Sequence, residues 1–322
     1  MSLVETHPHI AREAGPLLPY LLDPQIREIR CTSAGHVFTI HSEAGKQRQD
    51  DYDPQFLDGF LMLIADHVGG MWQKSSPRLH AADPALGFRI QAGRPPISEA
   101  AWMVCRKHNA RIYPLDDFEA KGILQHRSHH GASRRLEARA TIRETLEQAL
   151  LDRYSIVLSG AVGSSKTSLL NALLHALRHT DERIVILEED RELMCAAADS
   201  EFIRTADDPL VTMRDLGKDL LRMSPDWVVV GEVRDGIALD MLKAFQTGCP
   251  GLCTVHAPSA EETLPRFEQL VQEVSLDPQR HLIGEAVDVV VHLAQYGQLW
   301  HVTDFLAVDG WNGERYVTRS LL

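Results

Sequence analysis

The sequence is poor in cysteine, and this limits the scaffolds and sites that it can form. Its five cysteines stand at positions 31, 105, 195, 249 and 253. An odd number at scattered positions does not fit a disulfide framework. Cys249 and Cys253 also lack the second pair of ligands that a tetrahedral zinc site needs. We therefore expect free thiols in a reducing compartment.

Long apolar runs and an excess of basic residues are also missing. No stretch approaches the roughly 18 apolar residues of a membrane span, and the first residues lack the charged-then-apolar pattern of a signal peptide. The 33 basic and 45 acidic residues give a net charge of -12, which disfavours strong nucleic-acid binding. We expect a cytoplasmic protein that touches a membrane only through partners.

The apolar pattern divides the chain into two regions. Residues 1–125 predict a small α/β domain with strands near 26–30, 37–41, 87–90 and 102–105 and a helix over 54–68, which Gly69 and Gly70 end. Residues 126–133 are polar and lose periodicity, so we expect a linker over 126–140. The histidines in this segment predict a solvated loop rather than a metal site.

The second domain, residues 141–322, alternates apolar runs with helical segments. Continuous apolar runs at 154–159, 184–187 and 227–230 are typical of parallel strands covered on both faces. Residues 136–150 place apolar side chains on one helix face, and Ser259 to Glu262 form a capping box before a predicted helix over 262–274. Asn312-Gly313 predicts a hairpin between 298–308 and 314–319.

The most informative segment is Gly160-Ala-Val-Gly-Ser-Ser-Lys-Thr167, between an apolar run and a helical pattern. It matches a phosphate-binding loop, in which backbone N–H groups surround the phosphates, Lys166 reaches the outer phosphates and the Thr167 hydroxyl holds Mg²⁺. The residues predicted to bind nucleotide here are Gly160, Ala161, Val162, Gly163, Ser164, Ser165, Lys166, Thr167 and Ser168.

Ser165 departs from this motif, which has glycine just before the lysine. Glycine is used where the backbone needs a left-handed angle or approaches a ligand closely. If Ser165 adopts the required angle, the loop binds and hydrolyses ATP. If it does not, the protein is a nucleotide-binding scaffold with impaired hydrolysis.

Three polar clusters follow, each at the end of an apolar run, where an open α/β sheet binds its ligands. The first contains Glu188, and the second places Glu232 close to Arg234. A carboxylate at position 232 can orient or deprotonate the water that attacks a γ-phosphate, and an arginine can neutralise developing charge. In the third, His256 can contact phosphate, although a lone histidine is more often simply packed.

The phosphate loop and these three clusters occur in the order seen in secretion-superfamily traffic ATPases, and the chain resembles the conjugal-transfer (TrbB-like) and type IV secretion branch. The resemblance covers about residues 85–322. It implies a RecA-like P-loop NTPase domain behind a smaller N-terminal α/β domain, a hexameric ring, and ATP and Mg²⁺ as substrate and cofactor. It also implies partners among the inner-membrane and cytoplasmic components of a secretion or conjugation machine.

The resemblance assigns roles to individual residues. It implies that Glu188 positions metal and water, that Glu232 is the catalytic carboxylate, and that His256 lies near the phosphates. Arg106, and less strongly Arg89, correspond to an N-terminal arginine that reaches the nucleotide when the ring closes.

A second departure from the family is Cys249, which stands where the family usually has histidine, and we expect it near the site. A type II secretion or type IV pilus motor is the alternative within the family, although the paired Cys-x-x-Cys motif is absent.

Overall fold

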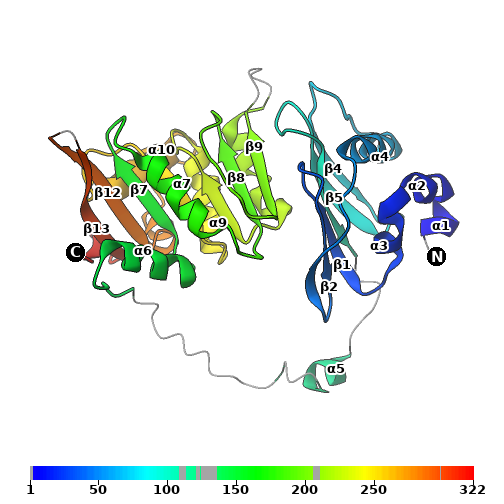
Figure 1. Cartoon of the computed structure of the whole chain (residues 1–322), viewed down its shortest axis with the longest axis horizontal. Helices are drawn as coiled ribbons and strands as arrows, with labels where there is room; N and C mark the ends of the chain where they lie inside the picture. Colours follow the sequence, from blue (N-terminus) through cyan, green and yellow to red (C-terminus); the bar gives the residue numbers. More distant parts are fainter. Residues whose placement is uncertain (1–2, 109–113, 121–123, 125–135, 206–210, 298) are drawn as a thin grey trace.

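The computed structural model describes residues 3–108, 114–120, 124, 136–205, 211–297 and 299–322. It contains one sheet in each half of the chain, with the short helix α5 (Leu115–Ala120) between them in sequence (Figure 1). Most of the predicted linker lies outside the described residues. The mixed α/β class predicted from the sequence is confirmed.

The N-terminal sheet has six antiparallel strands in the order β3-β2-β1-β6-β5-β4. Four of them confirm the predicted strands, whereas β3 and β4 were not predicted. Both are mostly polar or small in sequence, so they carry little of the apolar signal of a strand. The bounds are β1 (Ile26–Cys31), β2 (Val37–His41), β3 (Gly45–Arg48), β4 (Arg78–Asp83), β5 (Phe88–Gly93) and β6 (Trp102–Lys107).

Helices cover the face of this sheet that points away from the second sheet (Figure 1). The Asp53 side chain caps α4 by accepting from the Gln55 N–H, and the Gly70 N–H donates to the Ala65 carbonyl where the helix ends. Gly69 has a φ of +67°, as the predicted glycine stop requires. The elements are α1 (Leu3–Thr6), α2 (Pro8–Glu13), the 3₁₀ turn η1 (Gly15–Leu17), α3 (Leu18–Leu22) and α4 (Pro54–His67).

The C-terminal sheet has eight strands in the order β14-β13-β12-β7-β11-β10-β8-β9. The strands from β12 to β9 in this order are parallel, and β13 and β14 add the predicted antiparallel hairpin. The bounds are β7 (Ile156–Gly160), β8 (Ile184–Glu188), β9 (Ser200–Arg204), β10 (Trp227–Val230), β11 (Gly251–Val255), β12 (Val289–Tyr296), β13 (Leu299–Trp311) and β14 (Tyr316–Ser320).

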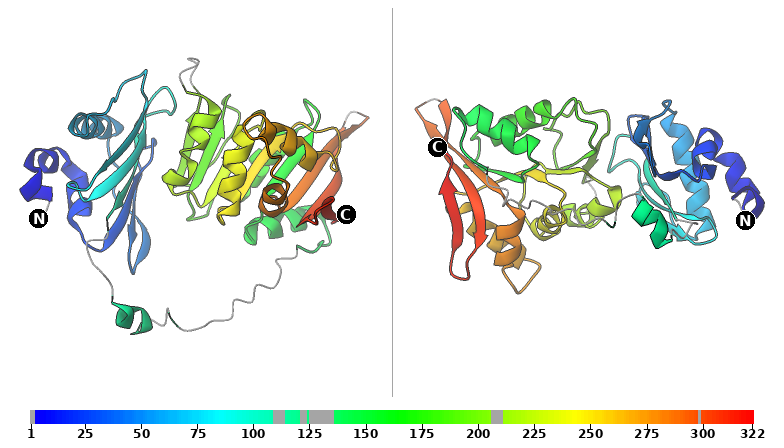
Figure 2. Two further views of the ribbon diagram at one scale, coloured as in Figure 1. Left: turned by 180° about the vertical axis from the view of Figure 1, so that it is seen from behind. Right: turned by 90° about the horizontal axis from the view of Figure 1, so that it is seen from below.

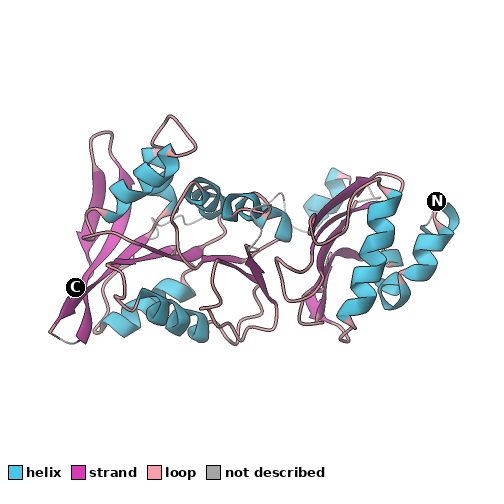
Figure 3. Ribbon diagram, turned by 90° about the horizontal axis from the view of Figure 1, so that it is seen from above, coloured by secondary structure: helices cyan, strands magenta, loops and turns pink. Residues whose placement is uncertain are grey.

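Helices cover both faces of the parallel strands (Figure 3), which explains their continuous apolar runs. Ile156 and Leu158 pack with the α6 and α7 side, whereas Val157 between them packs with the α9, α10 and α11 side. The remaining elements are α6 (Ile142–Leu151), α7 (Lys166–Ala176), α8 (Met213–Gly217), η2 (Leu220–Met223), α9 (Ile237–Gln246), α10 (Thr263–Gln272) and α11 (Arg280–Ala286).

Two predicted helices begin later than expected. The helix predicted over 136–150 begins at Ile142, because the Thr141 side chain caps it by accepting from the Glu144 N–H. Leu136 is buried in the core ahead of the helix. The predicted capping box is half formed: Ser259 Oγ accepts from the Glu262 N–H, but α10 begins one residue after Glu262.

The open face of the N-terminal sheet packs against the β8–β9 edge of the C-terminal sheet (Figure 2). Arg30 Nη1 lies 3.2 Å from Asp199 Oδ2, and the Ser33 N–H donates to Glu201 at 2.9 Å. Ile97 also belongs to the same apolar cluster as α8 and α9. The two sheets are therefore joined by buried ion pairs and hydrogen bonds as well as apolar packing.

Candidate nucleotide-binding site

The phosphate loop connects β7 to α7 at the carboxyl end of the parallel strands. Ser165 stands immediately before α7 with φ 62° and ψ 20°, which is the left-handed conformation, and its carbonyl accepts from the Leu169 N–H. Its side chain makes no capping hydrogen bond with the helix. Ser165 therefore supplies the backbone angle that the missing glycine would supply, at a cost of roughly 1–2 kcal/mol for a residue with a Cβ.

The two glycines of the loop are needed for different reasons. Gly163 has a φ of +73°, a conformation that residues with side chains rarely adopt. Gly160 lies beside β12, and a Cβ there would meet the Leu293 carbonyl oxygen at 2.5 Å and Ser164 Oγ at 2.6 Å. Close packing against a neighbouring strand thus excludes a side chain at position 160.

The Lys166 ammonium group is enclosed by the loop. Nζ donates to the carbonyls of Gly160 at 3.0 Å and Ala161 at 2.7 Å, and it lies 3.3 Å from both Ser164 Oγ and His256 Nδ1. Burial lowers the pKa of Lys166, and the charge of Glu232 opposes this shift. The loop therefore holds a cation next to the exposed N-terminus of α7, where phosphate would bind.

His256 connects this lysine to the second predicted cluster. Its Nε2 lies 3.1 Å from Glu232 Oε1, and Arg234 donates to both oxygens of Glu232 at 2.7 and 2.9 Å. Burial raises the pKa of Glu232, but Arg234, His256 and Lys166 outweigh it, so the net shift is downward. The ionised carboxylate accepts a hydrogen bond from Nε2–H, and Nδ1 lies 3.3 Å from both the Lys166 ammonium and the Gly160 carbonyl oxygen. The structure thus brings together the side chains predicted at 166, 232, 234 and 256.

A small cavity of about 60 Å³ lies beside this chain of contacts. The predicted metal-binding Thr167 lines it together with Glu232 and a group of acidic residues. Hydroxyl and carboxylate oxygens are the donors that Mg²⁺ prefers, so the lining fits this ion. The other lining residues are Glu188, Glu189, Asp190, Glu192, Leu193, Gly231 and Arg234.

Glu188 lines the cavity, but its carboxylate is already held on both sides. Oε2 accepts from the backbone N–H groups of Glu192 and Leu193 at 3.1 and 2.9 Å, and Oε1 pairs with Arg204 at 2.7–2.8 Å. The side chain is almost completely buried. Glu188 therefore orders the acidic loop after β8, and its predicted action on the metal stays a prediction.

Arg89 and Arg106 do not line the cavity beside the phosphate loop. They are cross-strand neighbours on β5 and β6, and Arg106 donates to Glu28 at 2.9 Å and to Ser224 at 2.7 Å. Together with Arg222 they line a separate cavity of about 360 Å³ between the two sheets. Within one subunit, Arg106 contacts Ser224, directly after η2, rather than the phosphate loop.

The expectation that Cys249 lies near the site is wrong. This residue precedes β11, whereas the phosphate loop and His256 follow the carboxyl ends of their strands. Its Sγ contacts the Pro225 carbonyl at 3.5 Å, and burial raises its pKa to about 12. The substitution at position 249 thus changes packing at the amino ends of the parallel strands, opposite the phosphate loop.

Two residues at the site had no role predicted from the sequence, although Glu189 was expected at the same edge of the sheet as Glu188. Arg204, the last residue of β9, pairs with Glu188, and Glu189 pairs with Arg234 at 2.8 Å. The acidic cluster after β8 was visible in the sequence. No local signal identified Arg204, because β9 is a half-buried edge strand whose pairing with β8 depends on the order of the sheet.

Comparison with known proteins places this site in a family. The family described as "Type II/IV secretion system protein" matches residues 123–298. A probable conjugal transfer protein TrbB from Sinorhizobium fredii is 31% identical, and the match covers 99% of this chain and 96% of the relative. A TrbB from Rhizobium radiobacter is also 31% identical over the same shares.

A solved structure agrees with these sequence relationships. The VirB11 ATPase of the Brucella suis type IV secretion system, in complex with sulphate, superimposes with a TM-score of 0.82 at 26% identity. The match covers 94% of this chain and 96% of that one. Both the order of the motifs and the fold agree with the predicted resemblance. The chain belongs to the type II/IV secretion system protein family, in its conjugal-transfer and type IV secretion branch of traffic ATPases.

Proposed function

We propose that this protein is an ATPase that couples ATP binding and hydrolysis to conjugative or type IV secretion, in pilus assembly or substrate transfer. The observation that carries the proposal is the continuous chain of contacts from Lys166 through His256 to Glu232 at the edge of the sheet. It joins the phosphate-binding cation to the carboxylate that would face the attacking water.

Each residue in this series of contacts has a role in the reaction. The backbone N–H groups at the start of α7 and the Lys166 ammonium stabilise phosphate charge. Glu232, ionised and held by Arg234 and His256, accepts a hydrogen bond from water and orients it towards the γ-phosphate. Arg234 compensates charge around the same carboxylate. His256 is a positioning residue that holds the Glu232 carboxylate and the Lys166 ammonium at a fixed separation.

Mg²⁺ would be held by Thr167 and by carboxylates of the adjoining acidic cavity, with Glu188 acting through water. When bound, the ion neutralises charge on the transferred phosphoryl group. Thr167 and the loop residues fix where the β- and γ-phosphates lie. Glu188 keeps the acidic loop in place through its two backbone hydrogen bonds.

The protein acts as a homo-oligomer, which we propose is a hexameric ring. Arg89 and Arg106 lie on the N-terminal sheet, which meets the C-terminal domain through ion pairs, hydrogen bonds and apolar packing, and they approach nucleotide when neighbouring subunits close around it. We propose the same domain boundaries as the sequence predicts, at 1–125, 126–140 and 141–322. None of the described helices is long and apolar enough to cross a membrane, and we propose a cytoplasmic location at the inner membrane through secretion partners.

The scaffold alternative required that Ser165 distort the loop. Because Ser165 adopts the left-handed angle and α7 begins directly after it, the geometry favours an active enzyme. Two relatives that match over 99% of this chain at 31% identity are conjugal transfer proteins, which favours that branch over a type II secretion or pilus motor.

Phosphate release by the purified full-length protein tests this function. Wild type should hydrolyse ATP in the presence of Mg²⁺, and Glu232→Gln should lower kcat by roughly 10²–10⁴-fold while retaining ATP binding. Light scattering with and without Mg-ATP measures the size of the ring. Glu314→Gln, at the exposed hairpin turn, is the matched control and should match wild type. Equal turnover of Glu232→Gln and wild type would refute the catalytic assignment.

A further inference from the structure

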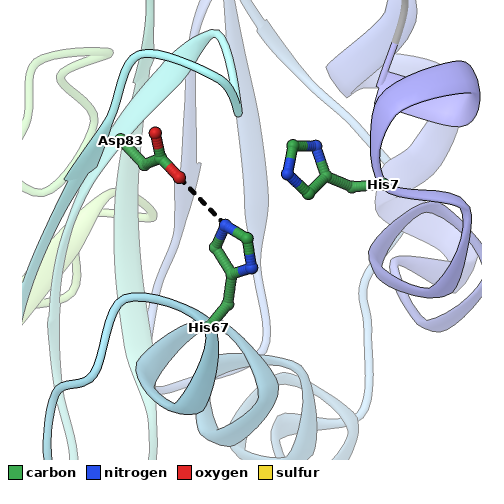
Figure 4. A group of neighbouring side chains, drawn as sticks. All are labelled: His7, His67 and Asp83. Carbon is green, nitrogen blue, oxygen red and sulfur yellow. Dashed lines mark hydrogen bonds and ion pairs between the residues drawn. The ribbon is translucent and has the colours of Figure 1, made fainter.

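Three side chains that can ligate a metal ion meet on the helix-covered side of the N-terminal sheet. His7 stands between α1 and α2, His67 is the last residue of α4, and Asp83 is the last residue of β4. One donor atom from each lies within 4.8 Å of the other two. Figure 4 shows all three side chains pointing into the same space from three separate elements. Nothing in the nucleotide site uses these residues.

The hydrogen bonds around the cluster leave suitable donor atoms facing its centre. His7 Nδ1 lies 3.0 Å from Thr6 Oγ1, which leaves Nε2 for a ligand, and Figure 4 shows a ring nitrogen of His7 facing the other two side chains. Asp83 Oδ1 accepts from the Ala85 N–H at 2.9 Å, and Oδ2 lies 2.9 Å from His67 Nε2. The contacts of His7 Nδ1 and Asp83 Oδ1 are made by atoms that do not ligate, and contacts of this kind fix the orientation of metal ligands.

The electrostatic environment favours a cation at this point. His67 ends a 14-residue helix, and the C-terminal end of a helix carries partial negative charge. Asp83 adds a carboxylate group to the same position. Two imidazoles, one carboxylate and a helix C-terminus therefore surround a single position.

We propose that His7, His67 and Asp83 bind one Zn²⁺ ion, with water as the fourth ligand. Nitrogen and carboxylate oxygen are ordinary zinc donors at about 2.0–2.2 Å, so neighbouring ligand atoms of a tetrahedral site lie about 3.3 Å apart. The His67–Asp83 separation of 2.9 Å is already close to this value. The largest distance between two of the ligand atoms is at most 4.8 Å, so these side chains must move about 1.5 Å closer together to bind the ion. When the ion binds, His67 Nε2 releases its proton to solvent and Nδ1 takes one up, so the ring stays neutral and the Nε2 lone pair faces the metal.

Zinc at this position would connect three segments that are far apart in sequence. His7 lies between two short helices, each of which is marginal alone because isolated helices of this length are unstable. The ion would fasten these helices to the end of α4 and to the β4–β5 turn. Its role is therefore structural, in ordering the first helices of the N-terminal domain.

The experiment uses full-length protein without a polyhistidine tag, stripped of metal with a chelator. Zn²⁺ is titrated calorimetrically in excess Mg²⁺, which occupies the acidic cavity at the nucleotide site. One equivalent should bind to wild type. His7→Ala and His67→Ala should each weaken binding by at least about 30-fold, and Asp83→Asn by about tenfold. Hydrogen exchange of residues 3–22 should slow when Zn²⁺ binds to wild type.

His36→Ala is the matched control, because His36 also pairs with an aspartate, Asp51, at 3.0 Å but has Arg48 beside it. This variant should bind Zn²⁺ as wild type does. Zinc X-ray absorption of the wild-type complex should report two imidazole ligands, which keeps the test valid if a variant fails to fold. Absence of a one-equivalent site, fewer than two imidazoles, or unchanged affinity in folded His7→Ala and His67→Ala would overturn the proposal.

Discussion

His256 Nε2 lies 3.1 Å from Glu232 Oε1, and this contact connects the ends of two neighbouring strands of the parallel sheet. Through its other ring nitrogen the same imidazole reaches Lys166 on the phosphate loop. A carboxylate and a phosphate-binding cation are thus held at a fixed separation by one side chain. The contact explains why a histidine, and not any polar residue, suits position 256, since two opposed ring nitrogens serve both neighbours.

Replacement of this histidine should therefore impair catalysis more than binding. We expect His256→Ala to lower kcat about 10–100-fold, which is less than the decrease expected when a general acid or base is removed. Its ATP affinity should change less than about threefold. His256→Gln should recover part of kcat, because its amide can still donate to Glu232. Steady-state phosphate release and equilibrium binding of ATP separate the two effects. His281→Ala, an exposed histidine of α11, is the control, and a purely weaker affinity in His256→Ala would contradict the positioning role.

The effects of substitutions at Ser165 should depend on how well the new residue adopts the left-handed backbone angle, and not on loss of the hydroxyl group. Ser165→Gly should keep turnover within about twofold of wild type and change the free energy of unfolding by at most about 1 kcal/mol, because relief of strain is offset by a more flexible unfolded chain. Ser165→Val should weaken ATP binding about tenfold or more, since a β-branched residue fits poorly at a φ of 62°.

Ser165→Ala is the control for these substitutions, because the side chain makes no capping bond, and it should behave as wild type. ATP binding and phosphate release measure the series. An inactive wild type that gains turnover with Ser165→Gly would instead support the scaffold alternative.

The buried pair of Glu188 and Arg204 should stabilise the acidic loop. Arg204→Ala leaves the Glu188 carboxylate buried without its ionic partner, and we expect a loss of about 3 kcal/mol in the free energy of unfolding. Glu188→Gln keeps an oxygen for the loop N–H groups and should cost only about 1–2 kcal/mol. Urea unfolding measures both.

The Mg²⁺ dependence of ATP hydrolysis separates the two roles of Glu188. If this residue acts on the metal, Glu188→Gln should need more Mg²⁺ for half-maximal turnover, whereas Arg204→Ala should not. Identical Mg²⁺ curves for wild type and Glu188→Gln would restrict Glu188 to ordering the loop.

Glu201, on β9 at the contact between the two sheets, should make stability depend on pH. Burial raises its pKa to about 7, above the ordinary glutamate value, although Arg183 and Ser33 oppose the shift. A raised carboxyl pKa favours the protonated folded form, so its contribution to stability is complete below about pH 4.5 and is lost as pH rises through about 7.

Glu201→Gln removes this titration while retaining an acceptor for the Ser33 N–H. Relative to wild type, the variant should gain on the order of 2–3 kcal/mol in the free energy of unfolding between pH 5 and pH 8. Urea unfolding at the two pH values gives the difference directly. If the difference in the free energy of unfolding between variant and wild type does not change with pH, Glu201 keeps an ordinary pKa.

The sequence alone identified the elements whose signal is local. The continuous apolar runs of β7, β8 and β10 were recognisable because both faces of these strands are covered. The glycine stop after α4 and the Asn312-Gly313 turn follow from backbone preferences of the residues themselves. Because parallel strands end at a common edge, the approximate meeting of Lys166, Glu232 and His256 could also be predicted.

Only the tertiary structure decided features that depend on which strands are neighbours and on backbone angles. The sequence does not determine whether the backbone of Ser165 is helical, extended or left-handed. The packing of β7 and α7 around it selects the left-handed conformation. Arg204 meets Glu188 because β9 pairs with β8, and Cys249 lies at the opposite edge because it precedes its strand. His7, His67 and Asp83 meet because α2, α4 and β4 fold against one another, a contact between distant segments that no local pattern in the chain encodes.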